Sequence, residues 1–330
     1  MYCDPMKILV TGGTGFIGGR TVGALLSQGG NEVSFTGRTP PKQTTLVDRG
    51  AKFLPGDLTD ETYVKRVTQN IEAIVHCAGL AGTWGTRDEF YRGNVLPTRL
   101  LLESAKTNGV RRFVNISSPS IYFDFKDQLN LKEGDLPKKF SNEYAKTKYE
   151  AEELVKAYHS KNLLTVSLRP RSVIGAGDQN VLPRLIRLQK TGNLVQIGAG
   201  RNVVDITTIG NLIDGIFLCL KAPEAAMGEV YNITNGAPIR FWDFVDEVLK
   251  TGGQSLKRRR IPYLPVMAAA MINEKMSKVL GRKKEPALLP ISVGIISFSM
   301  TLDISKAKKN LNYMPRFTTQ DGIHEFFARN

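Results

Sequence analysis

A glycine-rich segment near the N-terminus restricts the fold more than any other feature of the sequence. Residues 11–19 read TGGTGFIGG and follow an apolar run, KILVT, at residues 7–11. Glycine at positions 12, 15 and 18 permits a tight turn, lets a pyrophosphate approach the backbone and allows a helix to pack closely on a strand. The N-terminus of that helix offers unpaired N–H groups to phosphates. The order strand, glycine turn, helix therefore predicts a dinucleotide-binding unit.

Short apolar runs alternate with segments of helical spacing through the first half of the chain. The expected strands cover residues 7–11, 32–36, 51–54, 71–76, 112–117 and 163–169, and helices are expected at 90–108 and 142–159. This alternation predicts an α/β fold with a doubly wound parallel sheet of the Rossmann type.

The alternation weakens after residue 169, where helices are expected near residues 181–190, 209–220, 241–250, 262–280 and 303–311 with short strands between them. We therefore place a dinucleotide-binding domain at residues 1–170. A smaller mixed α/β substrate-binding region, partly interleaved with the first domain, is expected at residues 171–330.

The composition argues against several other classes of protein. Of the 330 residues, 42% are hydrophobic and 23% charged, which is ordinary for a globular protein and unlike disordered or fibrous chains. No apolar run approaches the roughly 18 to 20 residues that span a bilayer, and no signal-peptide pattern is present. The three cysteines lack the spacing of a structural metal site. We expect a cytoplasmic protein without a metal.

The net charge of +14 predicts an affinity for anions. The anions include nucleic acid, lipid headgroups and a phosphorylated cofactor. Since no helix-turn-helix, zinc-finger or aromatic RNA-binding signature occurs, we expect no nucleic-acid partner. A basic surface that only improves solubility is the alternative explanation.

Arg38 indicates which cofactor the chain prefers. Enzymes that use NAD usually carry an acidic residue at the end of the second strand, where it binds the ribose 2′-hydroxyl. This chain has Arg38 there, with Lys42 close by, and a guanidinium can pair with a 2′-phosphate. NADP(H) is therefore expected. The alternative is that Arg38 is only solvated and that NAD(H) is also accepted.

A tyrosine and a lysine four residues apart indicate acid-base chemistry. Tyr144 and Lys148 lie in a segment of helical spacing, so both side chains are expected on one helix face. A phenol is a poor catalyst near neutral pH, but a neighbouring ammonium and an oxidised nicotinamide favour its phenolate. The hydroxyls of Ser117, Ser118 and Ser120 follow the fifth expected strand, at the sheet edge where ligands bind.

Together these segments resemble the extended short-chain dehydrogenase/reductase family, within the NAD-dependent epimerase/dehydratase superfamily. TGGTGFIG resembles its cofactor loop, YAKTK its active-site motif, and residues 93–114 its central helix and strand. The resemblance continues through residues 168–178 and 303–316, so it covers nearly the whole chain. It implies an NAD(P)-dependent enzyme, and we expect a homodimer.

The resemblance also implies roles for individual residues. Ser118 is expected as the catalytic hydroxyl, with Ser117 as the alternative one residue away, beside Tyr144 and Lys148. Asn94 matches an asparagine of the central helix, and its role, catalytic or structural, is left open. The expected cofactor-binding residues are Gly12, Thr14, Gly15, Phe16, Ile17, Gly18, Arg38, Asp57, Leu58, Ala78, Gly79, Tyr144, Lys148, Pro170 and Val173.

Two positions differ from the motifs of sugar-nucleotide enzymes in this family and indicate which branch of the family the chain resembles. Sugar-nucleotide epimerases and dehydratases of this family usually place an arginine where this chain has Val204, and an asparagine where it has Ser172. Arg171 or Arg201 is a possible substitute for these contacts. By contrast, AGTWG (residues 81–85) and DISKAKKNLNY (residues 303–313) resemble the 3β-hydroxysteroid-dehydrogenase-like branch, with bacterial 2-alkyl-3-oxoalkanoate reductases closest.

The leading hypothesis is therefore reversible reduction of a ketone, with NADP(H), on a hydrophobic substrate such as a β-keto lipid or a sterol-like ring. A sugar-nucleotide epimerase or dehydratase is the runner-up. A binding protein that senses the cofactor without turnover is a third hypothesis, and the complete catalytic set argues against it.

One segment of the second half points to a membrane surface. Residues 262–280 carry many apolar side chains, including Val266, Met267, Ala270, Met271, Met276 and Leu280, and basic clusters flank them at residues 257–260 and 282–284. We expect an apolar-faced cover over the substrate that contacts a membrane or a lipid-handling partner enzyme. An ordinary core helix beside a charged surface is the alternative.

Overall fold

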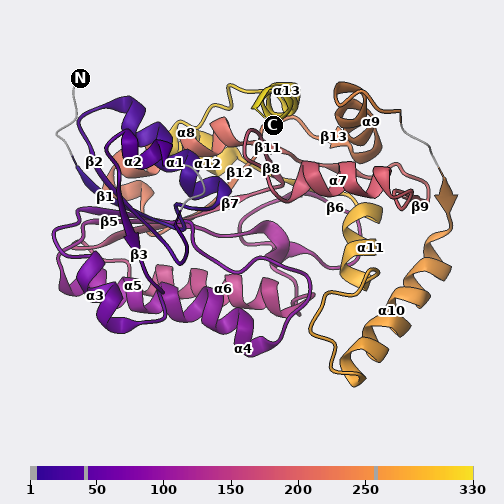
Figure 1. The fold of residues 1–330 in the computed structure, drawn as a ribbon, viewed down its shortest axis with the longest axis horizontal. Coiled ribbons are helices and arrows are strands. Elements are labelled where there is room, and N and C mark those ends of the chain that lie inside the picture. The colour runs from indigo at the N-terminus through magenta and orange to yellow at the C-terminus, as the bar shows by residue number, and fades with distance from the viewer. Residues whose placement is uncertain (1–5, 41–43, 256–258, 330) are drawn as a thin grey trace.

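A seven-stranded parallel sheet forms the centre of the molecule in a computed structural model, which describes residues 6–40, 44–255 and 259–329 (Figure 1). Its strands lie in the order β12-β7-β5-β4-β1-β2-β3, and each neighbouring pair is parallel. The strands are β1 (Lys7–Thr11), β2 (Glu32–Gly37), β3 (Lys52–Pro55), β4 (Ala73–His76), β5 (Arg112–Ile116), β7 (Leu164–Pro170) and β12 (Val230–Ile233).

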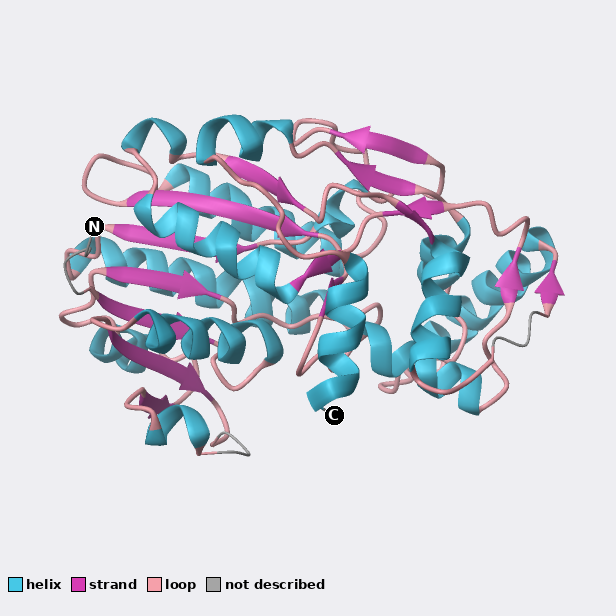
Figure 2. Cartoon of the chain, turned by 90° about the horizontal axis from the view of Figure 1, so that it is seen from above, coloured by secondary structure: helices cyan, strands magenta, loops and turns pink. Residues whose placement is uncertain are grey.

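All carboxyl ends of these strands lie along one edge of the sheet, and Figure 2 shows the long strands side by side. The strand order reverses between β1 and β4. Such a switch point creates a crevice in which open α/β sheets bind their ligands. The sheet confirms the predicted doubly wound α/β fold class.

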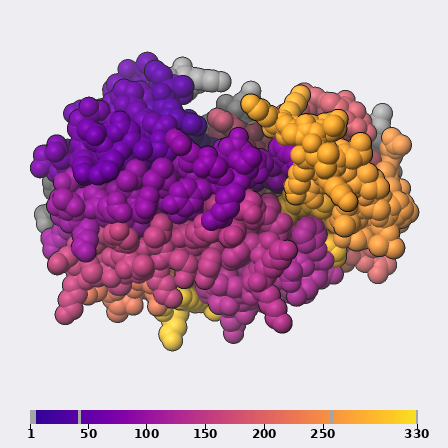
Figure 3. Space-filling view, turned by 90° about the horizontal axis from the view of Figure 1, so that it is seen from below, coloured from indigo at the N-terminus to yellow at the C-terminus, as the bar shows by residue number. Residues whose placement is uncertain are grey.

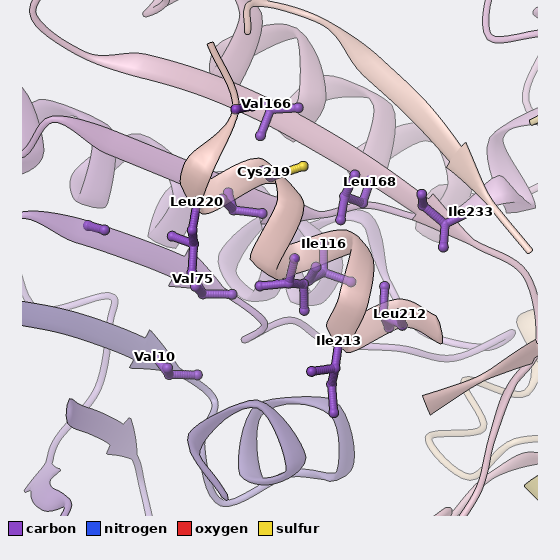
Figure 4. Close-up of a cluster of buried hydrophobic side chains, with 14 of the residues drawn as sticks. Val10, Val75, Ile116, Val166, Leu168, Leu212, Ile213, Cys219, Leu220 and Ile233 are labelled. Atoms are coloured by element: carbon purple, nitrogen blue, oxygen red, sulfur yellow. The ribbon is translucent and has the colours of Figure 1, made fainter. Parts of the chain in front are cut away.

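Helices cover both faces of the sheet because successive strand residues point to opposite sides. In β1, the side chains of Ile8 and Val10 join one buried cluster, and that of Leu9 joins another. The first cluster is covered by α1 (Phe16–Gln28) and α8 (Ile209–Lys221). Figure 4 shows Leu212, Ile213, Cys219 and Leu220 of α8 among the side chains of the strands. The second cluster is covered by α3 (Glu61–Val67), α5 (Leu96–Thr107) and α6 (Glu143–Ala157).

A smaller mixed sheet, in the order β13-β10-β15-β6, stands beside the first. It contains β6 (Gln128–Leu131), β10 (Val203–Val204), β13 (Ile239–Arg240) and β15 (Met300–Leu302). Two short parallel pairs complete the strands: β8 (Val173–Ile174) with β11 (Thr207–Thr208), and β9 (Gln196–Ile197) with β14 (Arg260–Ile261). The chain passes repeatedly between the two sheets, since β6 precedes β7 of the large sheet and β12 of the large sheet lies between β10 and β13 of the smaller one.

The remaining helices lie beside the smaller sheet or, as α2 and α12 do, beside helices that cover the large one. They are α2 (Thr45–Asp48), α7 (Val181–Lys190), α9 (Phe241–Thr251), α10 (Tyr263–Val279), α11 (Pro290–Ser297), α12 (Ser305–Leu311) and α13 (Thr319–Arg329), with the 3₁₀ turns η2 (Pro119–Tyr122) and η3 (Glu224–Ala226). A third buried cluster joins α7, α9 and α13. None of the helices in the described ranges has the length and apolar character needed to cross a membrane.

The helix expected at residues 90–108 is interrupted. It consists of α4 (Arg87–Phe90), the π-helical turn η1 (Tyr91–Val95) and α5. Pro97 lies in the first turn of α5, and a proline has no N–H to continue the preceding α-helical bonds. The wider turn is therefore favoured directly before it, and π-turns of this kind are frequent at functional sites.

Candidate active site

The glycine turn leaves an open surface at the N-terminus of α1. Gly12 has a φ of 66°, and a Cβ on it would lie 2.8 Å from the backbone of Ala78. A Cβ on Gly18 would lie 2.3 Å from the carbonyl oxygen of Gly12, so both positions need glycine for packing. Gly15, the N-cap of α1, is exposed, and the nearest atom to its Cβ position is the Gly12 oxygen at 3.3 Å. This accessible backbone, at a helix N-terminus, fits a pyrophosphate.

Other predicted cofactor residues lie in the turn itself or at the same edge of the sheet. Thr14 fills the space beside Gly37, where a Cβ would lie 2.5 Å from the threonine methyl. Phe16 and Ile17 open α1, and the ring of Phe16 lies 3.4 Å from the Cβ position of Gly177 in the loop after β8. Pro170 ends β7, and Val173 begins β8. All of these residues therefore lie at the carboxyl edge of the large sheet.

The charges of two arginines act on the carboxylate of Asp57. The Asp57 side chain accepts hydrogen bonds from the backbone N–H and the hydroxyl of Thr59, both at 2.9 Å. The backbone bond is the largest cause that lowers the pKa of Asp57, and the charges of Arg38 and Arg92 lower it further. Arg38 and Arg92 are exposed. Arg92 was not predicted from the sequence, because it is 54 positions from Arg38 and belongs to the π-turn.

The end of β4 lies against the helix that carries the catalytic motif. The Ala78 N–H donates to the hydroxyl of Thr11 at 3.2 Å. A Cβ on Gly79 would lie 3.0 Å from Oδ1 of Asn94 and 3.9 Å from Nζ of Lys148. The absence of a side chain at Gly79 thus allows β4 to end directly beside Lys148.

Lys148 is held inside the protein. Asn142 caps α6 by accepting the Ala145 N–H at 2.8 Å, and the helix then carries Lys148 toward β5. The ammonium is buried and donates to the carbonyl oxygen of Ile116 at 2.7 Å. Burial lowers the pKa of Lys148 to about 8, and the charge of Glu152 opposes that shift.

Tyr144 lies on the same helix, and its phenol interacts with Ser118. Burial raises the pKa of Tyr144, and the hydrogen bond with the Ser118 hydroxyl lowers it in part. The raised pKa differs from the expectation that the Lys148 ammonium favours the phenolate. The physical reason is that removal from water outweighs the favourable contacts that the phenol makes within the protein.

The geometry favours Ser118 over Ser117 as the reactive hydroxyl. Ser118 Oγ interacts with Tyr144 and also lies 2.9 Å from Ser120 Oγ. Ser117 Oγ is buried and has no hydrogen-bond partner within the described part of the chain. The structure thus brings Ser118, Tyr144 and Lys148 together where β5 ends.

Asn94 joins three elements around this site. Its Oδ1 accepts the Leu80 N–H at 2.8 Å, and its Nδ2 donates to the Leu80 carbonyl at 3.1 Å and to the Thr147 hydroxyl at 3.2 Å. Asn94 is buried and its hydrogen bonds are satisfied by protein groups. These contacts support a structural role, in which Asn94 fixes α6 against the loop after β4.

His76 is a packed strand residue. Its ring nitrogens lie 2.7 Å from the Thr11 hydroxyl and 3.0 Å from the Thr98 hydroxyl, and burial lowers its pKa to about 3. It is therefore neutral near pH 7 and fixes β4 between β1 and α5.

A buried ion pair holds α6 to the sheet. Arg169 of β7 is 2% exposed and donates from Nε to Oε2 of Glu152 at 3.0 Å. The Arg169 guanidinium also bonds the Tyr122 hydroxyl, which donates to Asn232 of β12 at 2.7 Å. The helix that carries Tyr144 and Lys148 is thus tied to β7 and, through Tyr122, to β12.

Aromatic and apolar side chains lie close to Tyr144 or follow Ser118 in sequence. The rings of Phe90 and Tyr144 are 5.9 Å apart. Tyr122 and Phe123, close behind Ser118 in sequence, belong to a buried cluster against which Trp84 and Phe298 pack. The segment that follows Ser118 is thus anchored in an apolar core.

The positions that differ from the sugar-nucleotide pattern have different surroundings. Val204, in β10, is 3% exposed and belongs to the third buried cluster. Its apolar side chain offers no charge to a ligand. Ser172 has a φ of 46°, and Arg201 is exposed. Arg171 is buried, its Nε has no hydrogen-bond partner among the described residues, and burial lowers its pKa to about 10 while Asp205 opposes the shift.

The chain matches one protein family over most of its length. The profile of the NAD dependent epimerase/dehydratase family matches residues 8–234. The chain belongs to this family. It is an NAD(P)-dependent enzyme of the short-chain dehydrogenase/reductase type, as the glycine turn and the YAKTK motif predicted.

Several curated relatives match nearly the full length. The uncharacterized protein YbjS of Escherichia coli is 36% identical, over 98% of this chain and 97% of that protein. A 2-alkyl-3-oxoalkanoate reductase of Stenotrophomonas maltophilia is 30% identical, over 98% and 99%. The decarboxylating sterol-4-alpha-carboxylate 3-dehydrogenase of Saccharomyces cerevisiae is 32% identical, over 98% and 97%.

A solved structure shares the fold. UDP-glucuronic acid 4-epimerase from Bacillus cereus, in complex with NAD, matches with a TM-score of 0.78 and 25% identity over 98% of both chains. The relatives by sequence thus include a reductase and a sterol dehydrogenase, whereas this structural neighbour is an epimerase.

Proposed function

We propose that the chain catalyses the reversible, NADP(H)-dependent reduction of a ketone on a hydrophobic substrate such as a β-keto lipid or a sterol-like ring. The single observation that carries this proposal is the contact between Tyr144 and Ser118 beside buried Lys148, at the carboxyl edge of the sheet. When bound, the nicotinamide supplies a hydride to the carbonyl carbon.

Side chains of the protein donate the proton and orient the carbonyl group. Tyr144 donates its phenolic proton to the carbonyl oxygen, which becomes the alcohol. Ser118 donates a hydrogen bond to that oxygen and so orients it toward Tyr144. Lys148 holds the nicotinamide ribose, and its positive charge stabilises the phenolate that forms as the proton leaves. A raised pKa keeps Tyr144 protonated at neutral pH, which suits a proton donor.

The preference for NADP(H) is supported by Arg38 together with Arg92. Both guanidinium groups influence the Asp57 carboxylate, so both stand on the side of the glycine turn where β2 and β3 end. Two cations in one place suit a 2′-phosphate better than a 2′-hydroxyl. Lys42, which the sequence also suggested, lies outside the described residues.

The hydrophobic substrate class is supported by the relatives and by the site. The reductase and the sterol dehydrogenase named above act, by their names, on an oxoalkanoate and a sterol carboxylate. Phe123, five residues after Ser118, is buried in an apolar cluster against which the half-buried Trp84 packs. Arg171, buried with an unpaired Nε, is suited to an acidic group that such substrates carry.

The alternative, a sugar-nucleotide epimerase, is favoured by the shared fold of the UDP-glucuronic acid 4-epimerase. Val204 argues against this alternative. A buried valine in β10 leaves that position without a cation for a diphosphate. Three expectations from the sequence remain predictions: that the protein is a homodimer, that its first domain ends at residue 170, and that it is cytoplasmic.

A panel of substrates tests the proposal. Purified protein is mixed with NADPH or NADH and with long-chain 3-oxo acids, a 3-oxosteroid, short water-soluble ketones or UDP-sugars, and oxidation of the cofactor is followed by its absorbance. We expect NADPH oxidation with an apolar ketone. Epimerisation of a UDP-sugar without oxidation of either cofactor by any ketone would replace the proposal with the runner-up.

A further inference from the structure

We propose that the outward face of α10, together with the basic segment that follows it, docks on an anionic lipid bilayer. The outward face is defined by Leu264, Ala268, Met271, Ile272, Met276, Val279 and Leu280, and the basic segment by Arg282, Lys283 and Lys284. This docking does not depend on the identity of the substrate.

Exposed apolar side chains are concentrated on the outward face, whereas in the rest of the described chain they are scattered. Thirteen large hydrophobic side chains are exposed among the described residues, and six of them fall within residues 264–280. These six are Leu264 (76% exposed), Met271 (60%), Ile272 (61%), Met276 (56%), Val279 (80%) and Leu280 (61%). A group of exposed apolar side chains on one helix indicates a protein or membrane contact.

The opposite face of α10 packs firmly, so its orientation is fixed. Ala270 is fully buried and packs with Val293 of α11. The rings of Tyr263 and Phe298 are 5.3 Å apart in an edge-to-face contact, and Asn273 donates to the Leu288 carbonyl at 2.8 Å. Figure 1 shows α11 between α10 and the rest of the molecule, and Figure 3 shows the orange segment as a lobe at one end.

This arrangement corrects the expected apolar face. Val266, Met267 and Ala270 pack toward α11, whereas Met271, Met276 and Leu280 point outward. Apolar residues therefore lie on both the packed and the exposed face of the helix. One half of α10 has that cover, and the other half is exposed.

Unpaired positive charges border the outward face. Lys275, Arg282, Lys283 and Lys284 are exposed, and none of them forms a salt bridge with another described residue. Arg259 and Arg260 of the preceding basic cluster are also exposed, while Lys257 and Arg258 lie outside the described residues. An apolar helix face bordered by cations is complementary to the boundary between acidic headgroups and acyl chains.

The same charges argue against a second copy of the chain as the occupant. A two-fold contact brings the same patch of two copies together. The cations of one copy would then face those of the other. The acidic residues of the segment already have partners, since Glu274 pairs with Lys278 at 2.8 Å and Glu285 accepts the Thr83 hydroxyl at 2.6 Å.

The docking face is connected to the catalytic edge. The Trp84 indole donates to the Arg282 carbonyl at 2.9 Å, which joins the loop after β4 to the basic segment. A Cβ on Gly294 of α11 would lie 2.7 Å from the ring of Phe123, five residues after Ser118. α10 and α11 thus form a cover between the proposed bilayer and the active site.

The test compares vesicle binding of matched variants of the full chain. Ile272→Glu/Val279→Glu places two charges on the outward face. Leu129→Glu/Met314→Glu makes the same change at side chains that are 60% and 76% exposed elsewhere. Each protein is centrifuged with vesicles of phosphatidylcholine alone or with added phosphatidylserine, at low and high salt, and folding is checked by thermal unfolding.

We expect the wild type to bind the vesicles that contain phosphatidylserine, and to bind less at high salt because salt screens the cations. Ile272→Glu/Val279→Glu should lower the partition coefficient at least about tenfold, and Leu129→Glu/Met314→Glu should leave it unchanged. A second pair of variants tests the cations of the basic segment. Lys283→Gln/Lys284→Gln should weaken vesicle binding more than the control Lys308→Gln/Lys309→Gln, which removes two cations of α12.

Three results would overturn the proposal. The first is no binding of the wild type to anionic vesicles, and the second is equal losses in the test and control variants. The third is a wild-type dimer, detected by light scattering, that Ile272→Glu/Val279→Glu converts to a monomer while vesicle binding is absent. That outcome would assign the face to a second copy.

Discussion

Asn94 and Thr147 are joined by a hydrogen bond of 3.2 Å that connects the π-turn η1 to the helix of Tyr144 and Lys148. The same amide bonds both backbone groups of Leu80. One side chain therefore fixes the catalytic helix relative to the loop at the end of β4. This makes Asn94 a positioning residue whose effect on turnover can be measured.

Asn94→Leu should lower kcat and also destabilise the protein by about 1–3 kcal/mol, because buried backbone groups of Leu80 lose their partners. Asn108→Leu is the matched control, since Asn108 donates to Thr68 and Lys65 at the far end of α5. The control should unfold at lower temperature with kcat unchanged. If both variants lose kcat in proportion to stability, Asn94 has no positioning role.

Tyr144→Phe should reduce turnover by about 10²-fold or more while NADPH binding stays nearly intact, since only the proton donor is lost. Tyr149→Phe serves as the control, because Tyr149 packs on Phe140 with ring centroids 5.0 Å apart. Steady-state kinetics and fluorescence titration of NADPH provide the measurements. Retention of more than a few per cent of the wild-type rate in Tyr144→Phe would contradict the assignment.

Arg38→Asp should weaken NADPH binding by about 2 kcal/mol or more, roughly thirtyfold, with a much smaller effect on NADH. Lys52→Asp makes the same charge change at the amino end of β3 and should affect neither cofactor. Arg92→Asp is expected to act in the same direction as Arg38→Asp. Equal losses for NADPH and NADH in Arg38→Asp would exclude contact with a 2′-phosphate.

The rate of ketone reduction should fall as pH rises through about 8. Burial lowers the pKa of Lys148 to about 8, so its ammonium is present below that pH and is lost above it. Burial raises the pKa of Tyr144, so the phenol stays protonated over the same range. The residual activity of Lys148→Arg should lack this descending limb, because a guanidinium stays charged. A pH profile of kcat/KM tests this, and an unchanged limb in Lys148→Arg would assign it to another group.

UDP should not bind with micromolar affinity in calorimetry, because Val204 is buried in β10 and offers no charge to a diphosphate. Val204→Arg is not a useful gain-of-function variant, since the side chain lies in the core. Micromolar binding of UDP to the wild type would point to Arg171 or Arg201 as a replacement contact and would support an epimerase.

Much of the large sheet was predictable because buried parallel strands are short apolar runs bounded by glycine or polar residues. The expected strand at residues 7–11 matches β1 at both ends, and that at residues 32–36 differs from β2 by one residue. The first four residues of α11, PISV, lack a helical charge pattern, and α11 was missed. The position of β12 was not predictable either, since its neighbour β7 precedes it by about sixty residues in a pairing set by tertiary contacts.

Within the site, the motifs predicted which residues gather at the carboxyl edge, because each motif follows a strand. The partners across the site were not predictable. The charge of Arg92 acts on Asp57 from a π-turn, and Asn94 bonds Thr147 across 53 positions. The direction of the Tyr144 pKa shift also depends on burial, which the i to i+4 spacing with Lys148 does not reveal.

The place of β12 in the large sheet has a consequence for synthesis on the ribosome. Until residues 230–233 emerge, the edge of β7 has unpaired backbone groups, and Tyr122 lacks its acceptor on Asn232. An exposed strand edge is prone to pair with another chain. We therefore expect a fragment that stops at residue 170 to aggregate, and the nascent chain to depend on chaperones until most of its length has been made.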